Sequence, residues 1–231
     1  MTDPVSPWAK MIKKLKLPPY MALKTSLNGS SNKADIYCVA SDGYRDYFSA
    51  MGTDIEKIAV TGIPNYDNAQ EFVENDFPHK DYVLVCTSDI REQKFSEDRL
   101  GFIEKCIEIA NGKPLFFKLH PNEKWDRAYS EIIQYAPKGT KVFQDEDTNK
   151  MIANCSELIT QYSSVVYIGI ALGKPVHSYF NIEALKKQLP IQNEGTSAYQ
   201  IASIAREFVD FNGDGKEFLH QYVPEHFLQT A

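Results

Sequence analysis

Two adjacent serines lie where a strand-like run gives way to an apolar, helix-like run. Ser163 and Ser164 follow ELITQY and precede VVYIGIALG. Two hydroxyl groups beside the unpaired N–H groups of a helix N-terminus can bind a phosphate, and the helix dipole favours its negative charge. Serine is also a preferred N-cap residue, so capping alone explains one of the two. We interpret the pair as a substrate-binding phosphate site.

A histidine stands at the end of another apolar run, in the segment FFKLHPNE. Pro121 fixes the backbone just after His120, where the expected strand ends. A histidine there can donate to a phosphate oxygen or act as an acid or base near neutral pH, and it can also simply stabilise a turn. Lys118, two residues earlier, shares a strand face with His120 and adds positive charge. We predict a catalytic role for His120 and substrate binding for Lys118.

Small or polar residues follow two further strand-like runs. Thr87 and Ser88 come after DYVLVC, and Gln144 comes after KVF, which ends at Phe143. Ligands of parallel α/β sheets bind beyond the carboxyl ends of the strands, so residues at these positions are candidates for substrate contact. This is a geometric rule, and no sequence motif supports it at these positions.

An acidic cluster, Asp145 to Asp147, follows the same run. Three carboxylates could bind a metal ion, but such a cluster more often complements the positive end of a helix, here with Asp147 or Thr148 as the cap. We therefore predict no metal site.

The elements that must position these residues alternate regularly along the chain. Strand-like runs span residues 35–41, 57–62, 81–88, 114–120, 141–143, 157–162 and 175–180, and helix-like runs cover 43–52, 101–112, 122–136, 148–155, 163–173, 182–189 and 199–211. Such alternation indicates parallel βαβ units. We predict an α/β protein with a Rossmann-like parallel sheet and helices on both faces, in which the ligand lies where the strand order reverses.

The first 34 residues differ from the rest. They contain four prolines and several lysines, and residues 8–17 could form an amphipathic helix. We predict that residues 1–34 form a leader or the remnant of another domain, and that residues 35–231 form the Rossmann-like domain that binds the ligand. Residues 8–27 could contact a membrane surface or a partner domain, or simply pack on the domain.

Composition excludes several classes of protein. The net charge of −6 and the pI near 5.4 argue against a nucleic-acid partner. The four cysteines form no C-x-x-C pair, and no stretch has the length of a membrane-spanning helix, so we expect a cytoplasmic protein. The absence of G-x-G-x-x-G, Walker and nucleophile-elbow motifs removes NAD dehydrogenases, P-loop ATPases and α/β-hydrolases. We expect no cofactor.

Three segments together resemble a known family. TGIPNYD resembles the turn that begins the second domain of two-domain GT-B enzymes, LFFKLHPNE resembles the K-x-HP motif of CDP-glycerol glycerophosphotransferases and capsule polysaccharide transferases, and ITQYSSVVYIGIALGKPV resembles their D-SS segment. The segments stand in the order and spacing of that family. The resemblance covers residues 35–180 and implies the C-terminal, donor-binding half of a GT-B fold.

The resemblance also implies roles for residues. His120 contacts the donor phosphates beside Ser163 and Ser164, and the loop at Phe143 and Gln144 lies near the base. Gly62 and Pro64 shape a hinge on the acceptor side. The donor is CDP-, CMP- or UDP-linked, and its developing negative charge is met without an obligatory metal.

The chain departs from the family in two ways. Gln161 stands where an acid is usual, and only a stub of the N-terminal half, which normally supplies the general base, is visible.

The resemblance implies a glycosyltransferase or glycerophosphotransferase of cell-surface polysaccharide synthesis, which could lie at the inner face of the membrane. Two other functions remain open. One is a UDP-N-acetylglucosamine 2-epimerase, which needs several carboxylates, with Asp89, Glu92 and Glu183 as candidates. The other is a non-catalytic nucleotide-sugar-binding module that needs a partner chain with the acceptor domain.

Overall fold

The computed structural model describes residues 11, 14–15, 17 and 34–222. It divides into two compact units: unit 1 comprises Met1–Asn68 and Lys187–Ala231, and unit 2 comprises Ala69–Lys186. The chain therefore leaves unit 1, forms unit 2 and returns to unit 1, a division that the alternation of strands and helices does not reveal. Nearly all of the predicted leader, including most of residues 8–27, lies outside the described residues.

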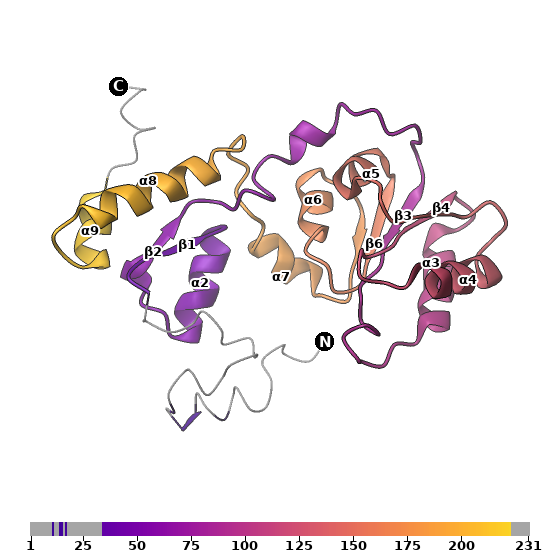
Figure 1. Cartoon of the computed structure of the whole chain (residues 1–231), viewed down its shortest axis with the longest axis horizontal. Coiled ribbons are helices and arrows are strands. Elements are labelled where there is room, and N and C mark those ends of the chain that lie inside the picture. Colours follow the sequence, from indigo (N-terminus) through magenta and orange to yellow (C-terminus); the bar gives the residue numbers. More distant parts are fainter. Residues whose placement is uncertain (1–10, 12–13, 16, 18–33, 223–231) are drawn as a thin grey trace. The chain divides into compact units, whose positions relative to one another are not determined.

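Unit 2 is built on a five-stranded parallel sheet (Figure 1). Its strands are β3 (Val83–Cys86), β4 (Leu115–Lys118), β5 (Lys141–Phe143), β6 (Glu157–Thr160) and β7 (Val176–His177). Their order is β5-β4-β3-β6-β7, and every neighbouring pair is parallel. The chain builds outward from β3 to β5 and then crosses to the other side of β3, so the strand order reverses between β3 and β6. The predicted α/β class and Rossmann-like parallel sheet are confirmed.

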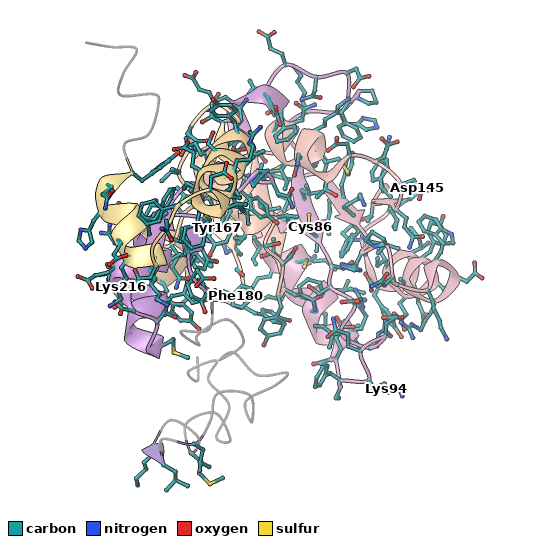
Figure 2. All side chains as sticks on the ribbon, turned by 60° about the vertical axis from the view of Figure 1, so that its left-hand side comes forward. Cys86, Lys94, Asp145, Tyr167, Phe180 and Lys216 are labelled. Atoms are coloured by element: carbon teal, nitrogen blue, oxygen red, sulfur yellow. The ribbon has the colours of Figure 1, made fainter. Side chains whose placement is uncertain are left out.

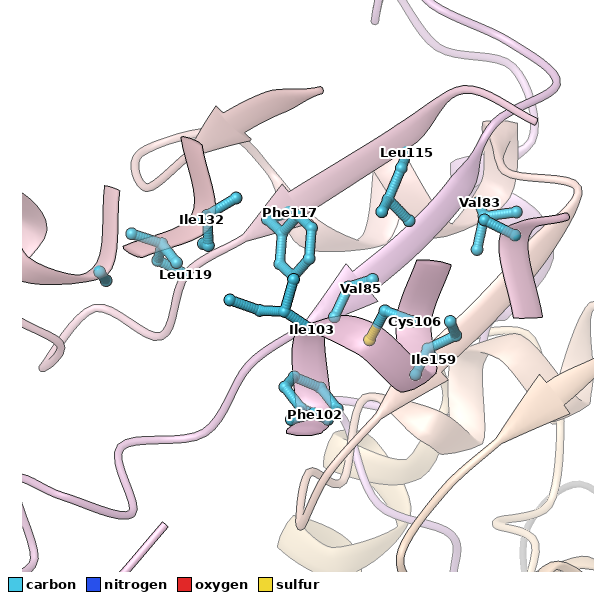
Figure 3. Close-up of a cluster of buried hydrophobic side chains, with 12 residues drawn as sticks. Val83, Val85, Phe102, Ile103, Cys106, Leu115, Phe117, Leu119, Ile132 and Ile159 are labelled. Atoms are coloured by element: carbon cyan, nitrogen blue, oxygen red, sulfur yellow. The ribbon is translucent and has the colours of Figure 1, made fainter. Parts of the chain in front are cut away.

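Helices cover both faces of this sheet. They are α3 (Arg99–Ala110), α4 (Trp125–Tyr135), α5 (Thr148–Asn154), α6 (Val166–Ala171) and α7 (Ile182–Lys187), with a 3-10 turn, η3, at Ala69–Phe72. On one face, Val85 and Phe117 pack against Ile103 of α3 within a cluster of buried apolar side chains (Figure 3). On the other face, Gly169 of α6 comes so close to Leu158 that an added Cβ would lie 2.5 Å from its side chain. Strand β3 is buried along its whole length, as expected for the central strand of a parallel sheet.

Unit 1 contains a two-stranded parallel sheet and three α-helices among its described residues. The elements are β1 (Tyr37–Val39), α2 (Asp42–Met51), η2 (Ile55–Lys57), β2 (Ile58–Val60), α8 (Ser197–Val209) and α9 (Gly215–Gln221). The last helix-like run in the sequence ends at residue 211, so α9 was not predicted. The helix begins with a capping box in which Asp214 and Glu217 bind each other's backbone N–H groups, a spacing visible in the sequence.

Candidate functional site

His120 lies two residues beyond the end of β4, and its neighbours hold it in place. Its backbone N–H donates to Thr87 Oγ1 at 3.1 Å and to Glu123 Oε2 at 3.2 Å. Its ring Nδ1 accepts a hydrogen bond from the backbone N–H of Asn122 at 3.2 Å. Because Nδ1 is an acceptor, the neutral ring carries its proton on Nε2. The side chain is 37% exposed, so His120 can offer an Nε2–H donor to a ligand.

Asp89, in the loop after β3, supports the same histidine. Asn122 Nδ2 donates to Asp89 Oδ2 at 2.9 Å, and Gln93 Nε2 donates to Asp89 Oδ1 at 2.7 Å. These hydrogen bonds, that of Asn122 above all, lower the pKa of the Asp89 carboxyl. Asp89 Oδ2 lies 3.9 Å from His120 Nδ1. Asp89 and His120 are thus joined through the side chain and the backbone N–H of Asn122.

Glu123 anchors the loop that carries His120. Its side chain is completely buried, and its two carboxylate oxygens bind Arg99 Nη2 and Thr87 Oγ1 in addition to the His120 N–H. Arg99 also contacts Glu97, with 3.2 Å between Nε and Oε2. A buried carboxylate is stable only when it is paired and hydrogen-bonded in this way. The sequence analysis missed both Glu123 and Arg99.

The loops after β3 and β6 are tied together where the strand order reverses. The Ser88 N–H donates to Gln161 Oε1 at 3.0 Å, and the Tyr162 N–H donates to Ser88 Oγ at 3.2 Å. The other end of the buried Gln161 amide donates to Glu97 Oε1 at 2.7 Å. Thr87 and Ser88 are both buried and bind within the protein. They hold the edge in shape, and their predicted contact with substrate stays a prediction.

Ser163 and Ser164 follow this tied segment and are reachable from solvent, with Ser163 half-buried and Ser164 exposed. The apolar run predicts a helix that begins at Ser163, but α6 spans only Val166–Ala171. The two serines form the turn before α6, in which the N–H of Tyr167 donates to the Ser164 carbonyl at 3.1 Å. Because α6 has only six residues, its dipole does not support phosphate binding at these serines. The hydroxyl groups remain as candidate phosphate ligands.

Internal contacts hold the loops on the β4–β5 side of the same edge, where a pocket of about 360 Å³ is lined in part by Phe143 and Gln144. Lys118 is buried, and its Nζ donates to the carbonyl oxygens of Gln144 at 2.7 Å and Leu119 at 3.3 Å. Burial lowers the pKa of Lys118. The Gln144 side chain donates to the Glu123 carbonyl at 3.0 Å, and the Phe143 ring packs 5.6 Å from Phe116. The ammonium predicted to bind substrate is therefore directed into the protein.

The acidic cluster acts as a helix cap. Asp147 Oδ1 accepts from the N–H groups of Asn149 at 2.8 Å and Lys150 at 3.2 Å at the start of α5. The described residues contain no group of three metal-ligating side chains. None of the described helices is long and apolar enough to cross a membrane.

The predicted site residues divide into three sets. The accessible ones are His120, Ser163 and Ser164, which lie at the ends of β4 and β6 on either side of β3. The partly or fully buried ones are Thr87, Ser88, Lys118, Phe143 and Gln144. The predicted hinge residues Gly62 and Pro64 lie in unit 1, where Gly62 has φ +80° and an added Cβ would lie 2.2 Å from Ser197 Oγ.

A pocket of about 510 Å³ opens beside the accessible set. Its lining comes from the loop between β3 and α3 and from the residues after β6 and β7, and includes Ser88, Asp89, Phe95, Glu97, Tyr162 and Tyr179. It thus lies at the carboxyl ends of the strands, where the strand order reverses, the position at which open α/β sheets bind ligands.

Comparison with known proteins supports the fold. No family model and no curated sequence matches the chain. A protein assigned as a UDP-N-acetylglucosamine 2-epimerase of Listeria monocytogenes superposes with a TM-score of 0.58 at 16% identity, covering 84% of this chain and 65% of that one. MnaA of S. aureus, solved with UDP, gives 0.57 at 11% identity over 88% of this chain and 71% of that one. The UDP-GlcNAc 2-epimerase of Neisseria meningitidis, solved with UDP-GlcNAc, gives 0.57 at 12% identity over 86% and 72%.

At these identities the likeness shows the fold alone. The chain spans about two thirds of the length of these proteins, and 65% of the Listeria protein.

Proposed function

We propose that unit 2 binds the phosphates of a nucleotide-activated donor at the carboxyl edge of its sheet, for the transfer of a sugar or a glycerol phosphate in cell-surface polysaccharide synthesis. The observation that carries this proposal is the placement of an Nε2–H donor on His120 and two accessible serines at the ends of β4 and β6. These strands lie on either side of β3, two strand spacings apart, so His120 and the serines are separated by about 10 Å. A ligand that contacts both must lie across the end of β3, where the strand order reverses.

The proposed chemistry is the stabilisation of a leaving phosphate. Cleavage of the donor leaves negative charge on the nucleotide phosphates, and hydrogen-bond donors already in position lower the energy of that state. His120 supplies Nε2–H, because its Nδ1 accepts from the Asn122 N–H. Ser163 and Ser164 supply hydroxyl groups. This scheme uses only residues of unit 2 and requires no metal ion.

The remaining predicted residues have indirect roles in this scheme. Thr87 and Ser88 hold the His120 loop and the Tyr162 segment, respectively. Lys118 holds the loop at Gln144, which together with Phe143 we propose to lie near the nucleobase. We also retain as proposals that Gly62 and Pro64 shape a hinge and that residues 8–27 contact an acceptor domain or the inner face of the membrane.

A second candidate is a nucleotide-sugar 2-epimerase, because the three structures described above are UDP-GlcNAc 2-epimerases or were solved with UDP. Epimerisation needs carboxylates around the sugar. Of those considered in the sequence, Glu92 is paired with Arg127 and Glu183 is exposed beside Lys186, so among these three only Asp89 lies near His120. Glu97 and Asp98 line the same pocket as Asp89, so carboxylates near His120 do not separate the two candidates, and the activity test below does.

A thermal-shift panel tests the proposal. CMP, CDP, UMP, UDP, GDP and ADP are added separately to the wild type, His120→Ala and Ser164→Ala. A ligand at a hundred times its dissociation constant stabilises the folded state by about 2.7 kcal/mol, and we expect this for one pyrimidine nucleotide and the wild type only. If no nucleotide stabilises the wild type, or if both variants respond like the wild type, the proposal is wrong. Conversion of UDP-GlcNAc to its 2-epimer by the wild type would establish the second candidate instead.

A further inference from the structure

The pocket where the strand order reverses differs chemically from the phosphate-binding groups beside it. We propose that this pocket binds the uncharged polyhydroxyl part of the ligand, a sugar ring or a short polyol, while the phosphates remain at His120 and the two serines. The inference rests on the proposed function, and it assigns the part of the donor that distinguishes one substrate from another.

The charges that line the pocket exclude a phosphate. Asp89, Glu97 and Asp98 contribute carboxylates, and the described residues that line it include no lysine, arginine or histidine. Lys94 lies at the outer tip of the loop between β3 and α3, away from Cys86 at the end of β3 (Figure 2). Glu97 is neutralised by Arg91 and Arg99, but Asp89 receives hydrogen bonds from neutral amides and keeps its charge. A phosphate in this pocket would be repelled.

Aromatic rings line the same pocket and are open to solvent. Tyr162 is 57% exposed and Phe95 is 67% exposed. The ring of Tyr162 meets the rings of Tyr179 and Phe180 edge to face, with centroids 5.2 Å and 5.4 Å away. Exposed aromatic rings gain from covering by the C–H faces of a ligand. The carbon face of a sugar ring presents such C–H groups.

The polar groups of the lining decide between a polyol and an organic cation, the other ligand that aromatic rings bind. Ser96 and the tyrosine hydroxyls can donate hydrogen bonds, and the carboxylates accept them. A polyol uses donors and acceptors together, because each hydroxyl group is both. A quaternary ammonium uses neither donors nor hydroxyl groups. The mixed lining therefore favours the polyol.

The pocket and the phosphate-binding groups are joined directly. Tyr162 precedes Ser163 in the chain, and its N–H is fixed by Ser88. Asp89 lines the pocket and lies 3.9 Å from His120 Nδ1. One ligand can therefore place its sugar or polyol against Tyr162 and its phosphate against His120, with the bond between them at the boundary.

Calorimetric titration of the full chain tests this assignment with two pairs of probes, UDP against UDP-GlcNAc and CDP against CDP-glycerol. The variants are Tyr162→Ala and Phe95→Ala, and the matched control is Tyr135→Ala, which removes an exposed tyrosine at the C-terminal end of α4. We expect the sugar or polyol to tighten binding in the wild type and the control. Tyr162→Ala should weaken binding of that conjugate about tenfold while the bare nucleotide changes less than about twofold. Equal losses for both members of a pair, or a gain that survives both variants, would overturn the assignment.

Saturation-transfer NMR separates failure of this inference from failure of the proposed function. N-acetylglucosamine, glycerol and choline are added separately to the wild type and Tyr162→Ala. If nucleotides do not bind but N-acetylglucosamine or glycerol gives a signal that Tyr162→Ala abolishes, the pocket assignment stands without the donor-binding proposal. A signal from choline alone, or no signal from the sugar and the polyol when nucleotides also fail to bind, contradicts it.

Discussion

The two sides of the sheet edge in unit 2 carry similar polar residues but use them differently. On the β4–β5 side, the side chains of Lys118 and Gln144 bind main-chain carbonyls and hold the loops together. On the β3–β6 side, hydrogen bonds of the buried Ser88 and Gln161 hold the loops after β3 and β6 together. Tyr162 and the two serines that follow it remain accessible. His120 follows β4, but its Nδ1 lies 3.9 Å from Asp89 in the loop after β3. Asn122 joins the two residues through hydrogen bonds.

This difference separates polar residues that hold the loops in place from polar residues that a ligand can reach. A side chain that follows a strand is a candidate ligand only if a ligand can reach it from solvent. The internal bonds of Glu123 and Gln161 keep the accessible groups in place, so the two kinds of residue depend on each other.

Glu123→Ala should have the largest effect, because it leaves Arg99 buried beside an empty space and releases Thr87 and the His120 N–H. We expect a loss of about 3–5 kcal/mol in the free energy of unfolding, measured by urea denaturation. The matched control is Glu108→Ala, which removes an exposed partner of Lys105 and should cost less than about 0.5 kcal/mol. Similar losses in the two variants would show that Glu123 does not anchor the loop.

Gln161→Glu tests the β3–β6 contact with a pH-dependent readout. It replaces the bond to Glu97 by two carboxylates in the same place, which should cost about 2–3 kcal/mol at pH 7 and raise the pKa of one of them. A raised pKa in the folded state means that the penalty is small at low pH, where the carboxyl is protonated, and grows as the pH rises. The double variant Gln161→Glu with Glu97→Gln should recover part of the loss. A penalty that does not change between pH 4 and pH 8 would argue against this contact.

Lys118→Met tests whether Lys118 acts only by holding the loop at Gln144. Loss of the bonds to the carbonyls of Gln144 and Leu119 should cost about 1–2 kcal/mol of stability. Because Lys118 acts through the loop, we expect the affinity for the nucleotide found in the thermal-shift panel to change less than about threefold, as determined by calorimetry. A loss of more than tenfold in affinity with little loss of stability would mean that the ammonium binds the ligand directly.

Asn122→Ala should have the smallest effect. Asn122 is the main cause of the lowered pKa of Asp89, and a carboxyl with a lowered pKa contributes stability above its unfolded pKa and loses it as the pH falls through the folded pKa. The variant should be about 1 kcal/mol less stable at pH 7. The difference from the wild type should shrink below about pH 4. Urea denaturation at several pH values checks this, and a difference that grows in acid would contradict it.

The sheet could be predicted from the sequence because its strands are continuous apolar runs separated by helical ones. The positions of His120, Ser163 and Ser164 after strands could also be predicted, since each follows such a run, and their role in binding stays a prediction. Their supports could not: Thr87 and Glu123 meet only because the register pairs Cys86 with Lys118 and so brings Thr87 level with the start of the His120 loop. Single-sequence patterns contain no register.

Two other features required the fold. The return of the chain to unit 1 after Lys186 leaves no mark in the alternation of strands and helices. Gln161 stood out in the sequence only because an acid is usual there in the family that the chain resembles. In the structure an acid at this position would meet Glu97, so the amide suits its surroundings.

The central claim is that the β3–β6 side of the edge, together with His120, is where the ligand binds. Amide chemical-shift mapping of the full chain with the nucleotide selected by the thermal-shift panel tests this most directly. We predict that the largest changes occur at His120, Ser163, Ser164 and the loop after β3, with smaller changes at Lys118. Changes concentrated in unit 1, at the groove of β2 and α9 lined by Ile58, Val60 and Leu219, would contradict the account.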